Sequence, residues 1–461
     1  MNRWFSEVCK KYSNRLLVYP NIYYKDFQKM SEIQKEQYML QGVKPGSKLL
    51  LNQYNSVQFL SRLKALWEIG ATTCIMSPKL SHTKKEDFKK ILLHKQKHDD
   101  KYLMTDALCM LTSGTTAATP KVVKLSHSNI QSHIEMLREH IPDSLIGKDD
   151  RTFSILPWTH CYGLLGECFS VLDRGASMGI LSPTCQQEFS FPVFFKDLHM
   201  TQPTILFVVP HLLEIIMKRD AQMKNYFTNK TIRRKFWFGS KLRYIVSGGA
   251  YLRNDIRKFF WDEFEIKIIQ GYGCTEMSPM IALQNEFDVD DHSVGKLLPN
   301  IQVRINTENE ILVNGPNRFL GYSGSPPLEY HEFYNTKDLG YVQNDRLYLT
   351  GRTSNMVKLS NGKFVDISHL ENNVKDMIPY AQDVCIWCEE DGRFAGIVHT
   401  LQDIPYKRYN VECFHEDIDV IVQNVSFTSP INGTLTQKGE KCRPMIKSIY
   451  GGKNKPLPSP L

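Results

Sequence analysis

The sequence predicts an α/β protein. Its large N-terminal domain has helix-covered, mostly parallel sheets plus a small distorted β-barrel, and a small mobile α+β C-terminal domain follows. Two observations carry this prediction. Short apolar runs alternate with segments of helical periodicity up to about residue 295, and short strand-like runs separated by turns replace that alternation further on. Alternating β-α-β order is typical of a parallel sheet covered by helices.

The first β-α-β unit is predicted between residues 48 and 76. Lys48–Asn52 is a run of strand length, and Ser56–Ile69 has the apolar spacing of an amphipathic helix. One face of this helix carries Val57, Leu60, Leu63 and Leu66. Gly70 is expected to end it, because glycine adopts the left-handed conformation readily. Thr72–Met76 returns as a strand.

The alternation continues along the chain. Leu108–Leu111 and Val122–Leu125 are predicted strands, and Ser126 is predicted to cap a helix. The apolar face of that helix consists of Ile130, Ile134, Leu137 and Ile141. Two further predicted strands are Ile205–Val209 and Tyr244–Val246.

The second part of the chain divides into smaller pieces. Its short strand-like runs are Gln302–Ile305, Glu310–Val313 and Arg346–Thr350. We expect a large domain of residues 1–353 and a smaller domain of residues 354–452. Residues 453–461 are rich in Lys and Pro and are expected to be a disordered tail.

The composition predicts a globular protein with more than one core, since the chain has 461 residues of which 42% are hydrophobic. No run approaches the ~18 apolar residues of a membrane span, and the N-terminus lacks a signal-peptide core.

The eleven cysteines form no disulfide-like framework, so a reducing, cytoplasmic location is expected. Cys385 and Cys388 form a CxxC pair in the strand-like run Asp383–Cys388, which favours structural thiols over metal or redox use.

The formal net charge of +8 is diffuse, with one concentration of lysines. These are Lys84, Lys85, Lys89, Lys90, Lys95 and Lys97. Such a run is typical of a solvated face, and it also suits polyanionic substrates or peripheral contact with an anionic membrane. Nucleic acid is not a predicted partner, because no aromatic interleaving or binding motif accompanies the lysines.

A loop of small hydroxylated residues, Thr112–Lys121, lies between two predicted strands. Its N–H groups and hydroxyls suit phosphate oxygens, and Lys121 adds a positive charge. It is not a Walker loop, because Gly-Lys-Ser/Thr is missing. On these residues alone, a phosphate site and a plain turn both remain open.

A second glycine-rich segment, Gly271–Glu276, follows the predicted strand Lys267–Ile269. Glycines permit a sharp turn, Tyr272 can stack on a base, and a carboxylate suits Mg²⁺, a hard ion that bridges phosphate oxygens. A turn with an exposed glutamate is the alternative.

Both segments resemble motifs of the adenylate-forming superfamily, which includes acyl-CoA synthetases, luciferases and peptide-synthetase adenylation domains. TSGTTAATPKVVKLSH resembles its phosphate loop, and GYGCTE resembles its G-Y-G-x-T-E motif. The other matching segments are Leu156–Gly163, Ser247–Ala250, Tyr334–Gly340, Gly351–Arg352, Lys358–Val365 and Gly433–Pro444. The matches follow the family's order over roughly Gly42 to Ile446.

The resemblance implies how ATP would be bound. The phosphate-binding residues it implies are Thr112, Ser113, Gly114, Thr115, Thr116 and Lys121. The residues around adenine would be Gly248, Gly249, Ala250, Tyr272 and Gly273. Thr275 would contact the α-phosphate, and Asp338 and Arg352 would bind the ribose hydroxyls.

The resemblance also implies the metal and substrate residues. Glu276 and Thr115 would hold Mg²⁺, and His160 would line the pocket for the acid. Amino-acid adenylation domains usually place an aspartate in this substrate loop to pair the substrate ammonium. No aspartate is present in Leu156–Gly163, which favours an acid without an α-amine.

Four positions depart from the family pattern. Ala117 and Lys337 stand where glycine is usual, and Ser354 stands at the hinge, where Asp or Lys is common. In the C-terminal motif, Glu440 occupies the place of the adenylation lysine. Of its neighbours, Lys438 is preferred for that catalytic role, and Lys441 is the alternative.

The resemblance implies a ligase similar to fatty acyl-CoA synthetases, working as a monomer with a mobile C-terminal domain that rotates between two half-reactions. It would use ATP and Mg²⁺ to convert a carboxylic acid into acyl-AMP, with Thr115 and Glu276 assisting, and would then transfer the acyl group to CoA or an acyl carrier protein. A catalytically weakened nucleotide- or acyl-binding relative and an amino-acid adenylation domain are the alternatives.

Overall fold

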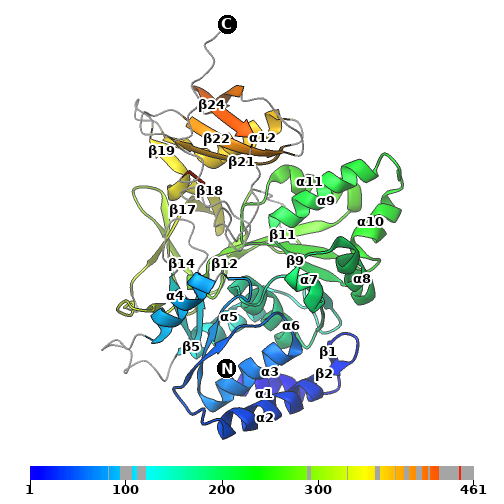
Figure 1. Ribbon diagram of the computed structural model, residues 1–461, viewed down its shortest axis with the longest axis vertical. Coiled ribbons are helices and arrows are strands. Elements are labelled where there is room, and N and C mark those ends of the chain that lie inside the picture. The colour runs from blue at the N-terminus through cyan, green and yellow to red at the C-terminus, as the bar shows by residue number, and fades with distance from the viewer. Residues whose placement is uncertain are drawn as a thin grey trace.

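The computed structural model has a large unit and a smaller C-terminal unit stacked along the long axis of the molecule (Figure 1). It describes residues 1–80, 82–93, 106–111, 121–287, 292–329, 331–358, 364–378, 381–388, 394–400, 407–413, 416–424 and 446–447. Layers of helices cover the sheets of the large unit (Figure 1). The predicted α/β fold class is confirmed.

One sheet of the large unit has the strand order β16-β6-β5-β4-β3. Its strands are β3 (Lys48–Leu51), β4 (Thr72–Ile75), β5 (Asp106–Leu111), β6 (Val122–Ser126) and β16 (Gly321–Tyr322). The first three are parallel, whereas β6 and β16 are antiparallel to their neighbours. Because β16 comes from far along the chain, this sheet is joined to the region after residue 295.

The second sheet has the order β14-β15-β17-β18-β13-β12-β11-β10-β9-β7-β8-β1-β2 among the described residues. Its strands are β1 (Leu16–Val18), β2 (Ile22–Tyr23), β7 (Arg151–Ser154), β8 (Ser177–Ile180), β9 (Ile205–Val208), β10 (Tyr244–Ser247), β11 (Lys267–Gly273), β12 (Met280–Leu283), β13 (Lys296–Leu297), β14 (Gln302–Ile305), β15 (Glu310–Asn314), β17 (Tyr334–Gln343) and β18 (Arg346–Arg352). Strands β7 to β11 pair in parallel. The short strands predicted after residue 295 extend this sheet in antiparallel fashion.

Helices pack on both sheets. They are α1 (Asn2–Lys11), α2 (Tyr24–Leu40), α3 (Val57–Ile69), α4 (His82–Leu93), α5 (His127–His140), α6 (Phe169–Arg174), α7 (Pro183–Gln187), α8 (Phe191–Thr201), α9 (Pro210–Met223), α10 (Lys230–Phe238) and α11 (Asn254–Phe264). Two short turns are the π-helical η1 (Tyr162–Cys168) and the 3₁₀ turn η2 (Thr275–Met277). Ser126 caps α5 by accepting a hydrogen bond from the Asn129 N–H, and Gly70 ends α3 at φ 84°, as predicted.

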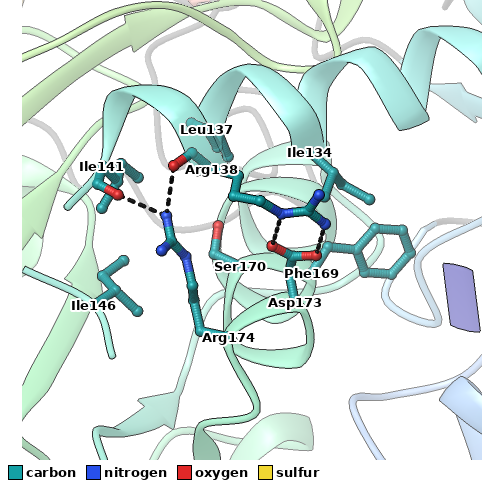
Figure 2. Close-up of a pocket in the computed structure, with 9 residues that line it drawn as sticks. All are labelled: Ile134, Leu137, Arg138, Ile141, Ile146, Phe169, Ser170, Asp173 and Arg174. Atoms are coloured by element: carbon teal, nitrogen blue, oxygen red, sulfur yellow. Dashed lines mark hydrogen bonds and ion pairs between the residues drawn. The ribbon is translucent and has the colours of Figure 1, made fainter. Parts of the chain in front are cut away.

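Helix α6 is held against α5 and α1 by one buried carboxylate. Asp173 accepts hydrogen bonds from Arg138 Nε and Nη2, at 3.0 and 2.5 Å, and from Trp4 Nε1 at 2.8 Å. Figure 2 shows Arg138 reaching from α5 to Asp173, while Arg174 points the other way and donates to the carbonyl oxygen of Ile141. These bonds surround a small apolar contact between the two helices (Figure 2).

In its described residues, the C-terminal unit has a two-stranded sheet, a four-stranded sheet and a helix. Its elements are η3 (Thr353–Asn355), β19 (Met356–Lys358), β20 (Phe364–Asp366), α12 (Ile367–Met377), β21 (Ala381–Cys388), β22 (Phe394–Thr400), β23 (Lys407–Cys413) and β24 (Glu416–Asn424). The predicted strand through Cys385 and Cys388 is confirmed as β21, which places Cys385 in the core. On the large unit, Glu214 accepts a hydrogen bond of 2.6 Å from Lys375 of α12.

No helix in the part of the chain that the structure describes has both the length and the apolar character needed to cross a membrane. Four of the concentrated lysines lie on α4, namely Lys84, Lys85, Lys89 and Lys90. Lys95 and Lys97 lie outside the described residues.

We expect Asp173→Ala to lower the free energy of unfolding by about 2–3 kcal/mol, because the buried Trp4 N–H and the Arg138 guanidinium would lose their acceptor. Denaturant unfolding monitored by circular dichroism measures this value. Asp149→Ala is the control: Asp149 pairs with Arg15 at 2.8 Å on the surface, with 80% of its side chain exposed. That variant should change the value by less than about 0.5 kcal/mol. Equal losses in the two variants would contradict the structural role of Asp173.

Candidate active site

The segment Gly271–Glu276 closes strand β11 and turns into η2. A Cβ atom at Gly273 would lie 1.8 Å from the carbonyl oxygen of Pro279, so this position requires glycine. The side-chain amide of Asn317 donates to the carbonyl oxygens of Met277 and Met280, at 2.5 and 3.0 Å. These bonds fix the turn, and Glu276 lies buried within it.

Tyr272, Asp338 and Arg352 meet beside this turn. The Tyr272 hydroxyl donates to Asp338 Oδ2 at 2.8 Å, and Arg352 Nε lies 3.3 Å from Asp338 Oδ1. Asp338 and Arg352 are direct partners in the antiparallel pair β17–β18. Burial raises the pKa of Asp338, and the positive charge of Arg352 opposes that rise. An aromatic ring, a carboxylate and a guanidinium are thus gathered at one point.

Glu276 contacts a residue that the sequence analysis did not identify. The Tyr322 hydroxyl donates to Glu276 Oε1 at 2.8 Å, and Lys121 Nζ lies 4.8 Å from the centroid of the Tyr322 ring. Burial raises the pKa of Tyr322, so its hydroxyl stays protonated as a donor. Tyr322 reaches this place because β16 pairs with β6, with Tyr322 opposite Val123. A strand of two residues is too short to show a hydrophobic period, so the sequence could not indicate β16 or the position of Tyr322.

The loop after β10 packs against the same turn. A Cβ atom at Gly248 would lie 3.2 Å from Cζ of Tyr162 and 3.4 Å from the carbonyl oxygen of Gly271. Gly249 adopts φ 84°, which favours glycine. Ala250 follows on the exposed side. The structure therefore brings Gly248 and Gly249 beside the turn that contains Tyr272.

The predicted substrate loop runs from Leu156 into η1. Asn55 holds it from the end of β3: its side chain donates to the carbonyl oxygen of Leu156 at 2.7 Å and accepts from the Trp158 N–H at 2.8 Å. Cys161 Sγ lies 3.2 Å from Thr275 Oγ1, so this loop adjoins η2. His160 is half-buried between these anchors. The sequence did not indicate this role of Asn55, because a single asparagine before a helix is typical of an ordinary loop.

Lys337 occupies its glycine-like position without disturbing the strand. Its φ of 62° lies in the left-handed region, where glycine is favoured. Lys337 Nζ lies 3.4 Å from Glu310 Oε1, and the same carboxylate accepts from Asn335 at 2.6 Å and Thr353 at 2.9 Å. Hydrogen bonding, led by that from Asn335, lowers the pKa of Glu310 to about 2. Glu310 thus ties the Asp338 strand to η3, where Ser354 lies exposed.

Several predicted residues lie outside the described part of the chain. They are Thr112, Ser113, Gly114, Thr115, Thr116, Lys438 and Lys441. Ala117 and Glu440 are outside it as well. Their predicted roles remain predictions.

The described residues offer one carboxylate for a nucleotide-bound cation. No three His, Cys, Asp or Glu side chains form a metal cluster in the described ranges. Mg²⁺ that is bound with substrate phosphates needs only one or two protein carboxylates. The buried Glu276 fits such a limited requirement.

We expect Glu310→Gln to lower the free energy of unfolding by about 1–2 kcal/mol at pH 7, because charge-assisted bonds to Asn335, Lys337 and Thr353 would weaken. The Glu310 pKa is depressed in the folded state, so its stabilisation is present above the unfolded pKa of about 4.3 and is lost as pH falls toward about 2. The difference in unfolding free energy between variant and wild type should therefore shrink as the pH falls from about 4.3 to about 2 in urea unfolding. The exposed Glu308→Gln serves as control, and a pH-independent difference would contradict the assignment.

Sequence comparison relates the chain to AMP-binding enzymes and to CoA ligases. The family model for AMP-binding enzymes matches residues 81–323. A probable 4-coumarate–CoA ligase 2 of Dictyostelium discoideum is 30% identical over 55% of this chain and 46% of its own length. The long-chain-fatty-acid–CoA ligase 1 of Schizosaccharomyces pombe is 24% identical over 61% of this chain and 48% of its own length. The chain spans about half the length of the curated relatives it matches.

Solved structures share the fold. The o-succinylbenzoate CoA synthetase of Bacillus subtilis, in complex with an acyl-adenylate intermediate, superposes with a TM-score of 0.76 at 17% identity and covers 96% of this chain and 97% of its own. The anthranilate CoA ligase AuaEII, in complex with anthranoyl-AMP, gives 0.75 at 15% identity and covers 96% of each chain. These matches extend across the large and C-terminal units alike.

Proposed function

Because the chain belongs to the AMP-binding enzyme family, we propose that it activates a carboxylic acid with ATP and transfers the acyl group to a pantetheine thiol such as that of CoA. The observation that carries the proposal is the meeting of Tyr272, Asp338 and Arg352 beside the buried Glu276. Relatives named as CoA ligases support the same reaction class. The residues present match what a nucleotide with a bound cation would require.

The first half-reaction forms acyl-AMP. A carboxylate oxygen of the acid bonds to the α-phosphorus of ATP, and the bond from that phosphorus to the bridging oxygen breaks, so pyrophosphate leaves with the electron pair. Asp338 would accept hydrogen bonds from the ribose hydroxyls, and Tyr272 and Arg352 hold it in position. Thr275 would contact the α-phosphate from η2. Positioning of this kind accounts for much of the catalysis in phosphoryl chemistry.

The charge on the phosphates requires compensation. Mg²⁺, when bound by Glu276 and Thr115, would neutralise negative charge on the phosphates. Lys121 adds a positive charge beside Tyr322, which orients the Glu276 carboxylate. Lys438, or Lys441 as the alternative, would complete the charge compensation from the C-terminal unit.

The second half-reaction transfers the acyl group. A thiolate sulfur bonds to the acyl carbon, and the bond from that carbon to the AMP oxygen breaks, which releases AMP. We propose a rotation of the C-terminal unit near Ser354, where η3 joins the units, to exchange the adenylation lysine for a thiol-binding face.

A fatty acid is the proposed substrate, and an aryl acid is the nearest alternative. The loop that contains His160 carries no carboxylate to pair a substrate ammonium, which argues against amino acids. Relatives include both fatty-acid and coumarate ligases. Exchange of pyrophosphate into ATP, with added acids from acetate to long-chain fatty acids and with 4-coumarate, separates these substrates.

A non-catalytic binding relative is the competing function, favoured by the departures at Ala117 and Lys337 and by Glu440 in the place of the adenylation lysine. At Lys337 the backbone is left-handed, which is the conformation that a glycine would favour. This departure is therefore only weak evidence against enzyme activity. A binding protein would show a nucleotide-dependent rise in melting temperature with no acid-dependent pyrophosphate exchange.

We expect Glu276→Gln to reduce acid-dependent pyrophosphate exchange by about 10²-fold or more at limiting Mg²⁺, because one metal-binding carboxylate is lost. The fold should persist, since glutamine still accepts the Tyr322 hydrogen bond. Glu308→Gln, a surface change in the same unit, should exchange at the wild-type rate. Wild-type activity of Glu276→Gln at every Mg²⁺ concentration would remove this residue from the site.

We expect Asp338→Ala to raise the KM for ATP more than it lowers kcat, because its contacts are remote from the reacting phosphorus. Wild-type enzyme should prefer ATP to 2′-deoxy-ATP, and the variant should lose that preference. The exposed Asp262→Ala on α11 should retain it. A preference that survives in Asp338→Ala would show that another group reads the ribose.

A further inference from the structure

A continuous row of aromatic rings lies on the outside of helices α8 and α10. Phe189 lies 4.9 Å from Phe191, Phe191 stacks on Phe195 at 6.1 Å, and Phe195 lies 5.0 Å from Phe236, all between ring centroids. Phe189 and Phe236 are exposed. Helices α8 and α10 lie together at the right-hand edge of the large unit (Figure 1). The row therefore joins two helices into one surface.

The connection from α9 to α10 carries two more exposed aromatic side chains. Tyr226 is 84% exposed and Phe227 is 52% exposed. Helix α10 is apolar on two sides: Trp237 and Phe238 are buried, whereas Ile232 and Phe236 face outward. We call the surface formed by Phe189, Phe195, Tyr226, Phe227, Ile232 and Phe236 the aromatic face.

The chain segment that contributes Tyr226, Phe227, Ile232 and Phe236 to the aromatic face is rich in positive charge. Residues 218–241 contain eight Lys and Arg residues and one acidic residue, Asp220. Arg233 is internal and pairs with Asp220 at 2.9 Å, and Lys224 pairs with Glu263 of α11 at 2.9 Å. Lys230, Lys235 and Lys241 remain exposed, and Lys230 donates a hydrogen bond to the Asp262 carbonyl oxygen.

Exposed apolar patches mark interaction sites, and their chemistry identifies the partner. Tyr226 and Phe227 stand between Lys224 and Lys230 in the chain, and the exposed Lys230 and Lys235 lie on the helix that follows them. Aromatic rings that enter the boundary between headgroups and acyl chains, with lysines that reach lipid phosphates, are typical of proteins bound to a membrane surface.

We propose that the aromatic face docks on the surface of an anionic lipid bilayer. The chain would lie on the membrane without crossing it, with the α9–α10 connection inserted to the headgroup level. The proposal goes beyond the proposed catalytic function and does not depend on it, because it rests on α8 and α10 rather than on the site at Glu276.

Co-sedimentation with vesicles tests this docking. The full chain should bind vesicles that contain phosphatidylserine, bind phosphatidylcholine vesicles at least about ten-fold more weakly, and lose binding at high salt. Tyr226→Ser/Phe227→Ser and Lys230→Glu/Lys235→Glu should each weaken binding to the anionic vesicles by about ten-fold or more. Thermal melting checks that each variant is folded.

Matched controls lie on α2, at the foot of the molecule in Figure 1. Leu40→Ser removes a more exposed apolar side chain, and Lys29→Glu reverses an exposed charge. Both controls should bind vesicles like the wild type. Equal loss in the controls, or no vesicle binding by the wild type, would overturn the proposal. A dimer in analytical ultracentrifugation that Phe227→Ser dissociates, without vesicle binding, would assign the face to a second copy instead.

Discussion

The candidate site depends on the antiparallel pairing of β17 with β18. This register sets Asp338 opposite Arg352, and the guanidinium partly offsets the cost of burying the carboxylate. A slip by one residue would turn Asp338 to the other face of the sheet. The ladder is irregular between Leu339 and Gly340, directly after Asp338, and such a bulge re-aims neighbouring side chains. Glu310 secures the same strand from its other neighbour, β15.

A second constraint is the short strand β16, which joins the two sheets of the large unit. Its pairing with β6 places Tyr322 between Lys121, at the end of the predicted phosphate loop, and Glu276, in the turn η2 after β11. Groups from three distant parts of the sequence are thereby held by one side chain. Since β16 belongs to the same sheet as β5 and β6, any shift between the sheets would move Glu276 relative to Lys121.

The site and the aromatic face use side chains in opposite ways. At the site, Asp338 and Glu276 are buried and held by hydrogen bonds, as a preorganised polar site requires. On the aromatic face, Tyr226 and Phe227 are exposed and flanked by lysines, so their apolar area is available to a partner. Fixed polar groups suit a small charged ligand, whereas exposed rings suit a broad, non-specific surface.

The sequence alone determined the local structure and the chemistry available to the site. The cap at Ser126, the helix end at Gly70 and the strand before Gly271 all follow from residues close in the chain, because capping and periodicity are local effects. The motif resemblance identified Asp338 and Glu276 as candidates.

Tertiary structure alone decided which groups meet. Tyr322 reaches Glu276 from 46 residues away, and Asn55 holds a loop 101 residues distant, because strand register and sheet order bring them together. Neither strand register nor sheet order produces a periodic pattern in the sequence.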